Sequence, residues 1–341
     1  MVAKLETNLD FLNAKVRAIH SRLYEGDRLN ELLRYRSLGE LGRVLLGDET
    51  LPGAIILERR LVERLAADLA FMWRFLKAPR DRLFIAAAMR LQLENLKVIL
   101  RSHLAGRRAP LESLPTIPLP EPFRWPKVEA RAQMSPQQIV LAIPEPLIRL
   151  SAAEALLLYS EKPVPLFIEA ALDRTYFGLL AEAFGKLAPD DRREVRPLID
   201  LELEIYNLMF ILRAKVNHHI DSETTADLAA PAIEGETPPP WVAEAAPYET
   251  ARDILARAPL GFQRLLAETP PSLPDIERRL WQHYYSLADA IYYGSFFTVA
   301  CPYAFAAIRR MELANLITAV ESARYGLSIE ETLPRLLRPL R

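Results

Sequence analysis

The stretch 201–215, LELEIYNLMFILRAK, has the residue spacing of a helix with one apolar face, and Asn207 lies on that face. Leu203 and Ile211 stand four residues before and after it, which places all three side chains on one side of a helix. A polar amide on an apolar helix face costs free energy unless it is hydrogen-bonded. The pattern therefore predicts a structural hydrogen bond in the core, and a ligand-binding asparagine is the alternative.

Two other segments have the same pattern. LQLENLKVILRSH at 91–103 surrounds Asn95, and MELANLITAVESAR at 311–324 surrounds Asn315. A polar side chain precedes each asparagine by three residues; these are Gln92, Glu204 and Glu312. Six residues after the asparagine the first two segments have Arg101 and Arg213, whereas the third has Glu321. We predict three equivalent helices that differ in charge at this last position.

A second marker fixes the length of each repeat. ERRL occurs at 58–61 and again at 277–280, and EAAL occurs at 169–172. The intervals from Glu58, Glu169 and Glu277 to the next asparagine are 37, 38 and 38 residues. Each interval predicts a long helix, a short turn and a second long helix, with turns at 77–82, 187–192 and 300–303.

Candidate helix starts lie upstream of each pair. Ser37 with Glu40 and Ser151 with Glu154 have capping-box spacing, and Thr250 with Asp253 imitates it. The chain thus reads as three copies of one helical unit of roughly a hundred residues, which suits a closed pseudo-three-fold object. We predict an all-α fold with repeat units at 1–118, 119–225 and 226–341, the last beginning with an acidic, proline-rich loop.

Composition narrows the class of protein. The 341 residues contain 43 Lys and Arg against 44 Asp and Glu, which gives no basic excess for nucleic-acid binding. Cys301 is the one cysteine, so no internal disulfide can form and a reducing cytoplasm is expected. The first twenty residues lack the apolar core of a signal peptide.

Prolines gather at 107–147 and 231–274, and they predict irregular connections between helical blocks. Residues 216–251 contain no Lys or Arg but seven acidic residues, among them Asp221, Glu223 and Asp227. This run is typical of a solvated flexible loop. An acidic contact for a basic partner is the alternative.

The uncharged stretch AIYYGSFFTVACPYAFAAI at 290–308 raises the question of a membrane span. It is short and interrupted by Gly294 and Pro302, so we expect one helix to end near Val299 and the next to begin at Pro302. The sister turns are charged, whereas this turn has Val299, Pro302 and Tyr303. Its apolar side chains predict either a partner contact or a turn covered by the proline-rich segment.

Enzyme motifs are sparse. The sequence has no GxxxxGK[ST], GxGxxG or GxSxG stretch. DDRRE at 190–194 offers Asp190 and Asp191, which could hold Mg²⁺ against a diphosphate if NHHIDSE at 217–223 faced them. The same acids also suit the positive end of a helix dipole. The sequence therefore predicts no catalytic residue, no cofactor and no metal site.

The order of these segments resembles a known family. FLNAKVRAIHSRLYEGDRLNELLRYRSLGELGRVLLG at 11–47 resembles the opening of the C subunit of archaeal and bacterial A/V-type rotary ATPases, whose eukaryotic counterpart is the d subunit of V-ATPases. RLQLENLKVILRSHLAGR, LIDLELEIYNLMFILRAKVN and YAFAAIRRMELANLITAVESARYGLSIEETLPRLL resemble its later segments. The likeness covers nearly the whole chain outside the two proline-rich stretches.

The resemblance implies a non-catalytic central-stalk protein shaped as a three-fold funnel. Such a protein lies on the cytoplasmic face of the membrane, without a transmembrane segment of its own. Its partners are the central shaft subunits and the membrane proteolipid ring, whose rotations it couples during ion translocation. Two alternatives stay open: a helical scaffold outside this machine, and an all-α Mg²⁺-dependent enzyme that uses Asp190 and Asp191.

Overall fold

The computed structural model describes residues 9–47, 53–106, 119, 123–129, 132–235, 237–267, 272–296 and 298–340. Within these residues the chain is helical and contains no strand, which confirms the all-α prediction. The chain divides into two compact units. Unit 1 comprises residues 1–84, 117–122 and 281–341, and unit 2 comprises residues 85–116 and 123–280. The division falls inside α5 (Arg80–Leu104) and α15 (Leu273–Gly294).

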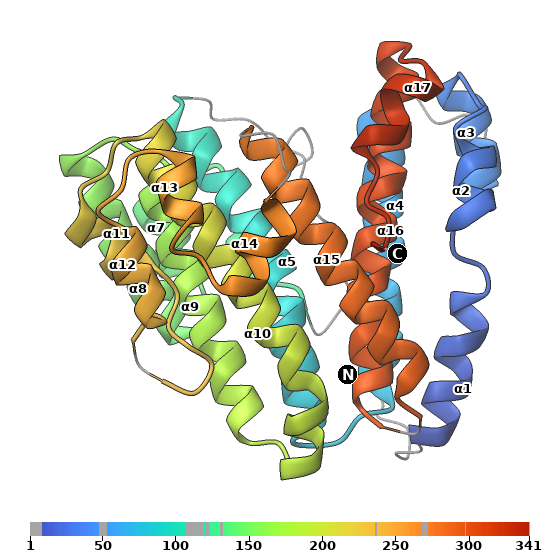
Figure 1. Cartoon of the computed structure of the whole chain (residues 1–341), viewed down its shortest axis with the longest axis horizontal. Coiled ribbons are helices and arrows are strands. Elements are labelled where there is room, and N and C mark those ends of the chain that lie inside the picture. Colours follow the sequence, from blue (N-terminus) through green and yellow to red (C-terminus); the bar gives the residue numbers. More distant parts are fainter. Residues whose placement is uncertain are drawn as a thin grey trace. The chain divides into compact units, whose positions relative to one another are not determined.

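Unit 1 is built around two long helices, α4 and α16, which run side by side (Figure 1). Leu57 and Leu61 of α4 pack with Leu316 and Val320 of α16 in its core. The periodic leucines make one apolar face on each helix, and burying both faces stabilises the pair. The helices that lie wholly in this unit are α1 (Leu9–His20), α2 (Gly26–Leu32), α3 (Leu38–Leu46), α4 (Ala54–Arg74), α16 (Ala300–Tyr325) and α17 (Ile329–Thr332).

Local sequence sets where α3 begins and ends. Ser37 accepts a hydrogen bond from the backbone N–H of Glu40, whose side chain reaches back to the Ser37 backbone, so the predicted capping box is confirmed. Gly47 ends the helix at a φ of 75°, in the left-handed region that favours glycine. The chain can therefore turn sharply out of α3.

Unit 2 packs α9 against α8 and α10. α10 begins with Pro189 at its first position and with Asp190 and Asp191 in its first turn, so the predicted helix start is confirmed. A π-helical turn, 213–217, follows α10. The helices that lie wholly in this unit are α6 (Pro126–Glu129), α7 (Pro136–Leu141), α8 (Pro146–Glu161), α9 (Leu166–Gly185), α10 (Pro189–Leu212), α11 (Ser222–Leu228), α12 (Pro240–Ala245), α13 (Ala251–Leu255) and α14 (Leu260–Leu266).

The three predicted pairs of long helices are present as α4 and α5, α9 and α10, and α15 and α16. One boundary was predicted wrongly: α15 ends at Gly294 and not near Val299, and α16 already begins at Ala300. Glycine loses more conformational freedom in a helix than any other residue, and here that weak position coincides with the turn. The proline at 302 is tolerated inside the first turn, where its missing N–H has no helical partner.

Two further expectations need correction. Ser151 lies inside α8, where its Oγ donates to the carbonyl of Ala171 at 3.0 Å; α8 begins instead at Pro146, capped by Glu145. The fixed φ of Pro146 makes it the better helix start. The acidic run 216–251 is not a continuous irregular loop, because α11 and α12 form within it. Part of the proline-rich stretch 107–147 lies outside the described residues.

Candidate functional site

Asn207 of α10 is fully buried and binds the backbone of one residue in both directions. Its Nδ2 donates to the carbonyl of Ala230 at 3.0 Å, and its Oδ1 accepts the N–H of Ala230 at 2.8 Å. Ala230 follows α11, so the amide ties the chain after this short helix back onto α10. Both polar atoms of the side chain are thus hydrogen-bonded within the protein, as buried polar groups normally are.

Asn315 of α16 makes the same pair of bonds in unit 1. It donates to the carbonyl of Leu337 at 2.7 Å and accepts the Leu337 N–H at 2.7 Å. The partners of Asn207 and Asn315 lie 23 and 22 residues further along the chain. Asn95, the third asparagine of the sequence pattern, is half-buried on α5. Asn207 and Asn315 thus each fasten a following segment by one shared geometry.

The Arg and Glu markers of the sequence meet within unit 2. Arg101 of α5 pairs with Glu169 of α9 at 3.1 Å. Arg213, directly after α10, donates through one nitrogen to both carboxylate oxygens of Glu277 on α15, at 2.8 Å each. In sequence order, each arginine pairs with the marker glutamate of the next predicted repeat. These pairs are partly exposed, so each contributes little to stability but fixes the register of two helices.

The third marker glutamate meets another acid within unit 1. Glu58 of α4 lies within hydrogen-bonding reach of Glu321 on α16. Burial, followed by the hydrogen bond and charge of Glu321, raises the pKa of Glu58 to about 7. Two carboxylates cannot both stay charged at such close range at low cost. Where the other two marker glutamates have an arginine, Glu58 has a carboxyl partner.

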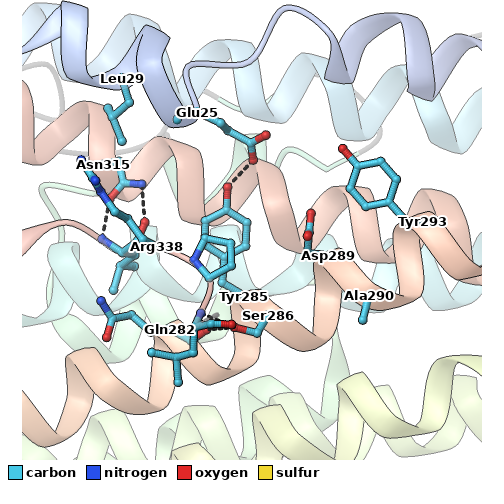
Figure 2. A pocket seen from close by; sticks show the side chains of 14 residues that line it. Glu25, Leu29, Gln282, Tyr285, Ser286, Asp289, Ala290, Tyr293, Asn315 and Arg338 are labelled. Atoms are coloured by element: carbon cyan, nitrogen blue, oxygen red, sulfur yellow. Dashed lines mark hydrogen bonds between the residues drawn. The ribbon is translucent and has the colours of Figure 1, made fainter.

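Unit 1 also contains an open pocket of about 750 Å³ (Figure 2). Glu25, Tyr285, Asp289 and Tyr293 give it an acidic and aromatic side, and the Tyr285 hydroxyl donates to the Glu25 carboxylate. Figure 2 shows Tyr285, Asp289 and Tyr293 on α15, with Glu25 pointing toward Tyr285 from the start of α2. The remaining lining residues are Gly26, Leu29, Gln282, Ser286, Ala290, Leu337, Pro339 and Leu340.

The electrostatics of this pocket favour positive charge. Burial and the nearby Glu25 carboxylate raise the pKa of Asp289, while His20 opposes that effect. Arg338 donates to Asn30 at 2.6 Å, and the Ser286 hydroxyl is bound to backbone carbonyl and amide groups. Carboxylates beside tyrosine rings can accept an ammonium or guanidinium group. This pocket was not predicted from the sequence, although Tyr285, Asp289 and Tyr293 recur every four residues, as on one face of a helix.

The apolar turn also belongs to unit 1. Val299, Pro302 and Tyr303 are buried, so they do not form the exposed contact surface that the sequence suggested. Tyr293 and Phe296, which precede the turn, have 54% and 59% of their area exposed. The sequence did not reveal this difference because a turn's exposure depends on which other segments pack over it.

Within unit 1, helix α1 packs against the turn and the end of α15. Asn13 donates to the carbonyl of Thr298 at 3.3 Å, and Arg17 donates to the carbonyl of Tyr292 at 3.3 Å. His20 stacks on the Tyr292 ring at 4.5 Å. Cys301 is buried at the same place, and burial raises the pKa of its thiol to about 11, which keeps it protonated.

The three acidic residues proposed as partner contacts lie in unit 2. Asp221 caps α11 by accepting the backbone N–H of Thr224 at 2.8 Å, and this bond lowers its pKa. Glu223 and Asp227 lie on α11, and both side chains are exposed. Other acids of the same run bind within the unit, since Glu249 pairs with Lys215 at 2.8 Å. Asp221 is therefore also a structural residue.

Asp190 pairs with Arg193 at 3.0 Å, and Asp191 is buried at the start of α10. In the described part of the chain, no three His, Cys, Asp or Glu side chains gather where they could hold a metal ion. Across the same ranges, no helix combines the length and apolarity of a membrane span.

Comparison with known proteins gives one family. Residues 12–334 match the family described as the ATP synthase (C/AC39) subunit. The C subunit of the A-type ATP synthase of Methanothermobacter thermautotrophicus is 28% identical over 209 residues. That alignment covers 60% of this chain and 54% of the relative, so the chain spans about half the length of the curated relative it matches.

Proposed function

The chain belongs to the ATP synthase (C/AC39) subunit family, and from this premise we propose that it is a non-catalytic rotor protein that couples a central shaft to a membrane proteolipid ring. The match over residues 12–334 carries this proposal, since it spans both compact units. The protein would lie on the cytoplasmic face of the membrane as a peripheral part of the complex. Ion translocation and ATP chemistry would then be carried out by other subunits.

A three-repeat architecture, with boundaries at 118 and 225, forms part of this proposal. Arg101 of the first repeat pairs with Glu169 of the second, and Arg213 of the second pairs with Glu277 of the third. Glu321 of the third repeat lies beside Glu58 of the first. Contacts in the order one to two, two to three and three to one support a closed pseudo-three-fold ring, the funnel that the resemblance implies.

A protein that couples two rotating parts transmits torque only if its own parts do not yield. Close-packed helices resist deformation, and buried polar groups that are fully paired hold one arrangement. The amides of Asn207 and Asn315 supply such pairing, because each fastens a segment more than twenty residues away. These bonds support a stiff body more than a site that opens and closes.

The acidic face of α11 is our candidate for a contact with a basic segment of the shaft or ring. Reversing Glu223 and Asp227 to lysine is expected to weaken recovery of the partner subunits about fivefold, since exposed charge pairs each contribute a fraction of a kcal/mol. Asp221 stays unchanged in this variant because it caps α11. Quantitative mass spectrometry of pulled-down complexes measures the loss.

A matched control for this variant is Glu154→Lys, which reverses an exposed acid on α8. Its recovery of partners is expected to equal that of the natural chain. If the α11 variant keeps its thermal midpoint and recovers as much of the partner subunits as the natural chain, α11 is not a contact surface.

The proposed function is tested by a tagged pull-down of the full chain from gently solubilised membranes of its own organism. Recovery of proteolipid ring and shaft subunits would support the rotor assignment. If the chain is recovered without those subunits from cells that express them, the result would instead favour a helical scaffold that shares only ancestry with the rotary ATPase.

A further inference from the structure

The three marker glutamates have unequal partners. Glu169 and Glu277 each bind an arginine, at 3.1 and 2.8 Å. Glu58 stands at the same place in the sequence pattern, and the residue that reaches it from α16 is Glu321. Because position 321 has a glutamate where positions 101 and 213 have arginines, an ion pair is replaced here by a pair of carboxyl groups.

The surroundings of Glu58 indicate how these two carboxyl groups interact. Its Oε1 is buried and has no hydrogen-bond partner. The side chain is half-buried, and its carboxyl faces that of Glu321, so a hydrogen bond between them needs a proton on one of the two. Glu321 also accepts a hydrogen bond from Arg324 at 3.1 Å, so the carboxyl that reaches Glu58 is itself held in place on α16.

We propose that Glu58 and Glu321 hold one proton between them, and that this proton makes the contact of α4 with α16 a pH-sensitive joint. The joint is closed while the proton is bound. It loosens when the proton passes to water, because two negative carboxylates are then left face to face at a partly buried site. The comparison with the other two pairs rests on the proposed repeat architecture, whereas the carboxyl pair itself lies within unit 1.

The direction of the pH effect follows from linkage. The pKa of Glu58 in the folded chain, about 7, lies above its ordinary value of 4.5. Between these values the folded state binds a proton that the unfolded state has released, so stability falls as pH rises. The stabilisation is complete below about pH 4.5 and is lost as pH rises through about 7.

The charged groups that act on Glu58 both come from α16. The Glu321 carboxyl raises its pKa, and the Arg324 guanidinium lowers it. Helix α3 also packs on α4, but its Glu40 is held in the capping box at Ser37. Glu58 therefore has a carboxyl where the other marker glutamates have an arginine, and Arg324 offsets the charge of that carboxyl only in part.

The test measures stability of the isolated full chain at pH 6 and pH 8. Glu58→Gln keeps a hydrogen-bond donor toward Glu321 but cannot titrate, and Glu321→Arg restores the residue type of positions 101 and 213. Glu154→Arg changes the net charge by the same amount as Glu321→Arg, at an exposed site on α8. In both test variants we expect the fall in Tm between the two pH values to be smaller by about 3 °C than in the natural chain.

Hydrogen exchange locates the effect. After correction for intrinsic rates, peptides from 54–65 and 316–325 are expected to exchange faster at pH 8 than at pH 6 in the natural chain and in Glu154→Arg, but not in Glu58→Gln. A natural chain with no such change, or test variants that keep it, would overturn the joint. Neither readout involves other subunits, so failure here leaves the rotor assignment standing, and an empty pull-down leaves the joint testable.

Discussion

Replacing Arg309 with methionine is expected to lower the free energy of unfolding of unit 1 by about 3 kcal/mol. Arg309 is buried on α16, where its Nε donates to Asp68 of α4 at 2.8 Å and its guanidinium pairs with Glu312. The Glu312 side chain is only 2% exposed. Removing the arginine leaves that carboxylate in the core without its counter-charge, and a stranded buried charge costs more than the pair contributes.

The double variant Arg309→Met with Glu312→Gln separates charge from packing. Its neutral amide can still accept the backbone N–H of Tyr24, which now binds the Glu312 carboxylate at 2.7 Å. We expect it to recover about half of the lost free energy, as measured by urea unfolding. A double variant as unstable as the single one would show that lost packing of Arg309, and not the stranded carboxylate, causes the effect.

Replacing Asn207 with leucine is expected to destabilise unit 2 by about 3 kcal/mol. The side chain and Ala230 are both fully buried, so the substitution leaves an N–H and a carbonyl of Ala230 without partners or water. Each such group costs about 1–3 kcal/mol, partly offset by the more apolar leucine. Thermal unfolding and hydrogen exchange of peptides around 222–233 measure the loss.

Asn217→Leu is the matched control, because Asn217 is exposed at the end of the π-helical turn. It makes the same chemical change and should alter the free energy of unfolding by less than about 0.5 kcal/mol. If Asn207→Leu lowers the free energy of unfolding no more than Asn217→Leu does, the two hydrogen bonds of Asn207 add nothing net to stability.

Helix positions followed from the sequence because their causes are local. Spacing of three and four residues placed apolar faces on α4, α9, α10, α15 and α16. Proline at 189 and the Ser37 capping box marked helix starts through contacts within one turn. The failures at Ser151 and Gly294 are also local, because competing start and stop signals lay close to each other along the chain.

Surface and burial did not follow from the sequence. The turn with Val299, Pro302 and Tyr303 has the composition of an exposed apolar patch, yet α1 covers it from far away in the sequence. The acidic pocket likewise joins Glu25 to Tyr285 and Asp289 across a long separation. Its periodicity was visible on one helix, but a pocket needs a second wall that periodicity cannot supply.

The sequence by itself determined the pairs of long helices, the family and the special status of the positions that hold Asn207, Asn315, Glu58 and Glu321. Only the tertiary structure decided what those polar groups contact. Asn207 and Asn315 bind the backbone of Ala230 and Leu337, and the Glu58 carboxyl meets that of Glu321. Helix formation depends on neighbours three and four residues away, which the sequence displays directly. The partner of a buried polar group depends on which distant segment packs over it, and that is settled only when the whole core closes.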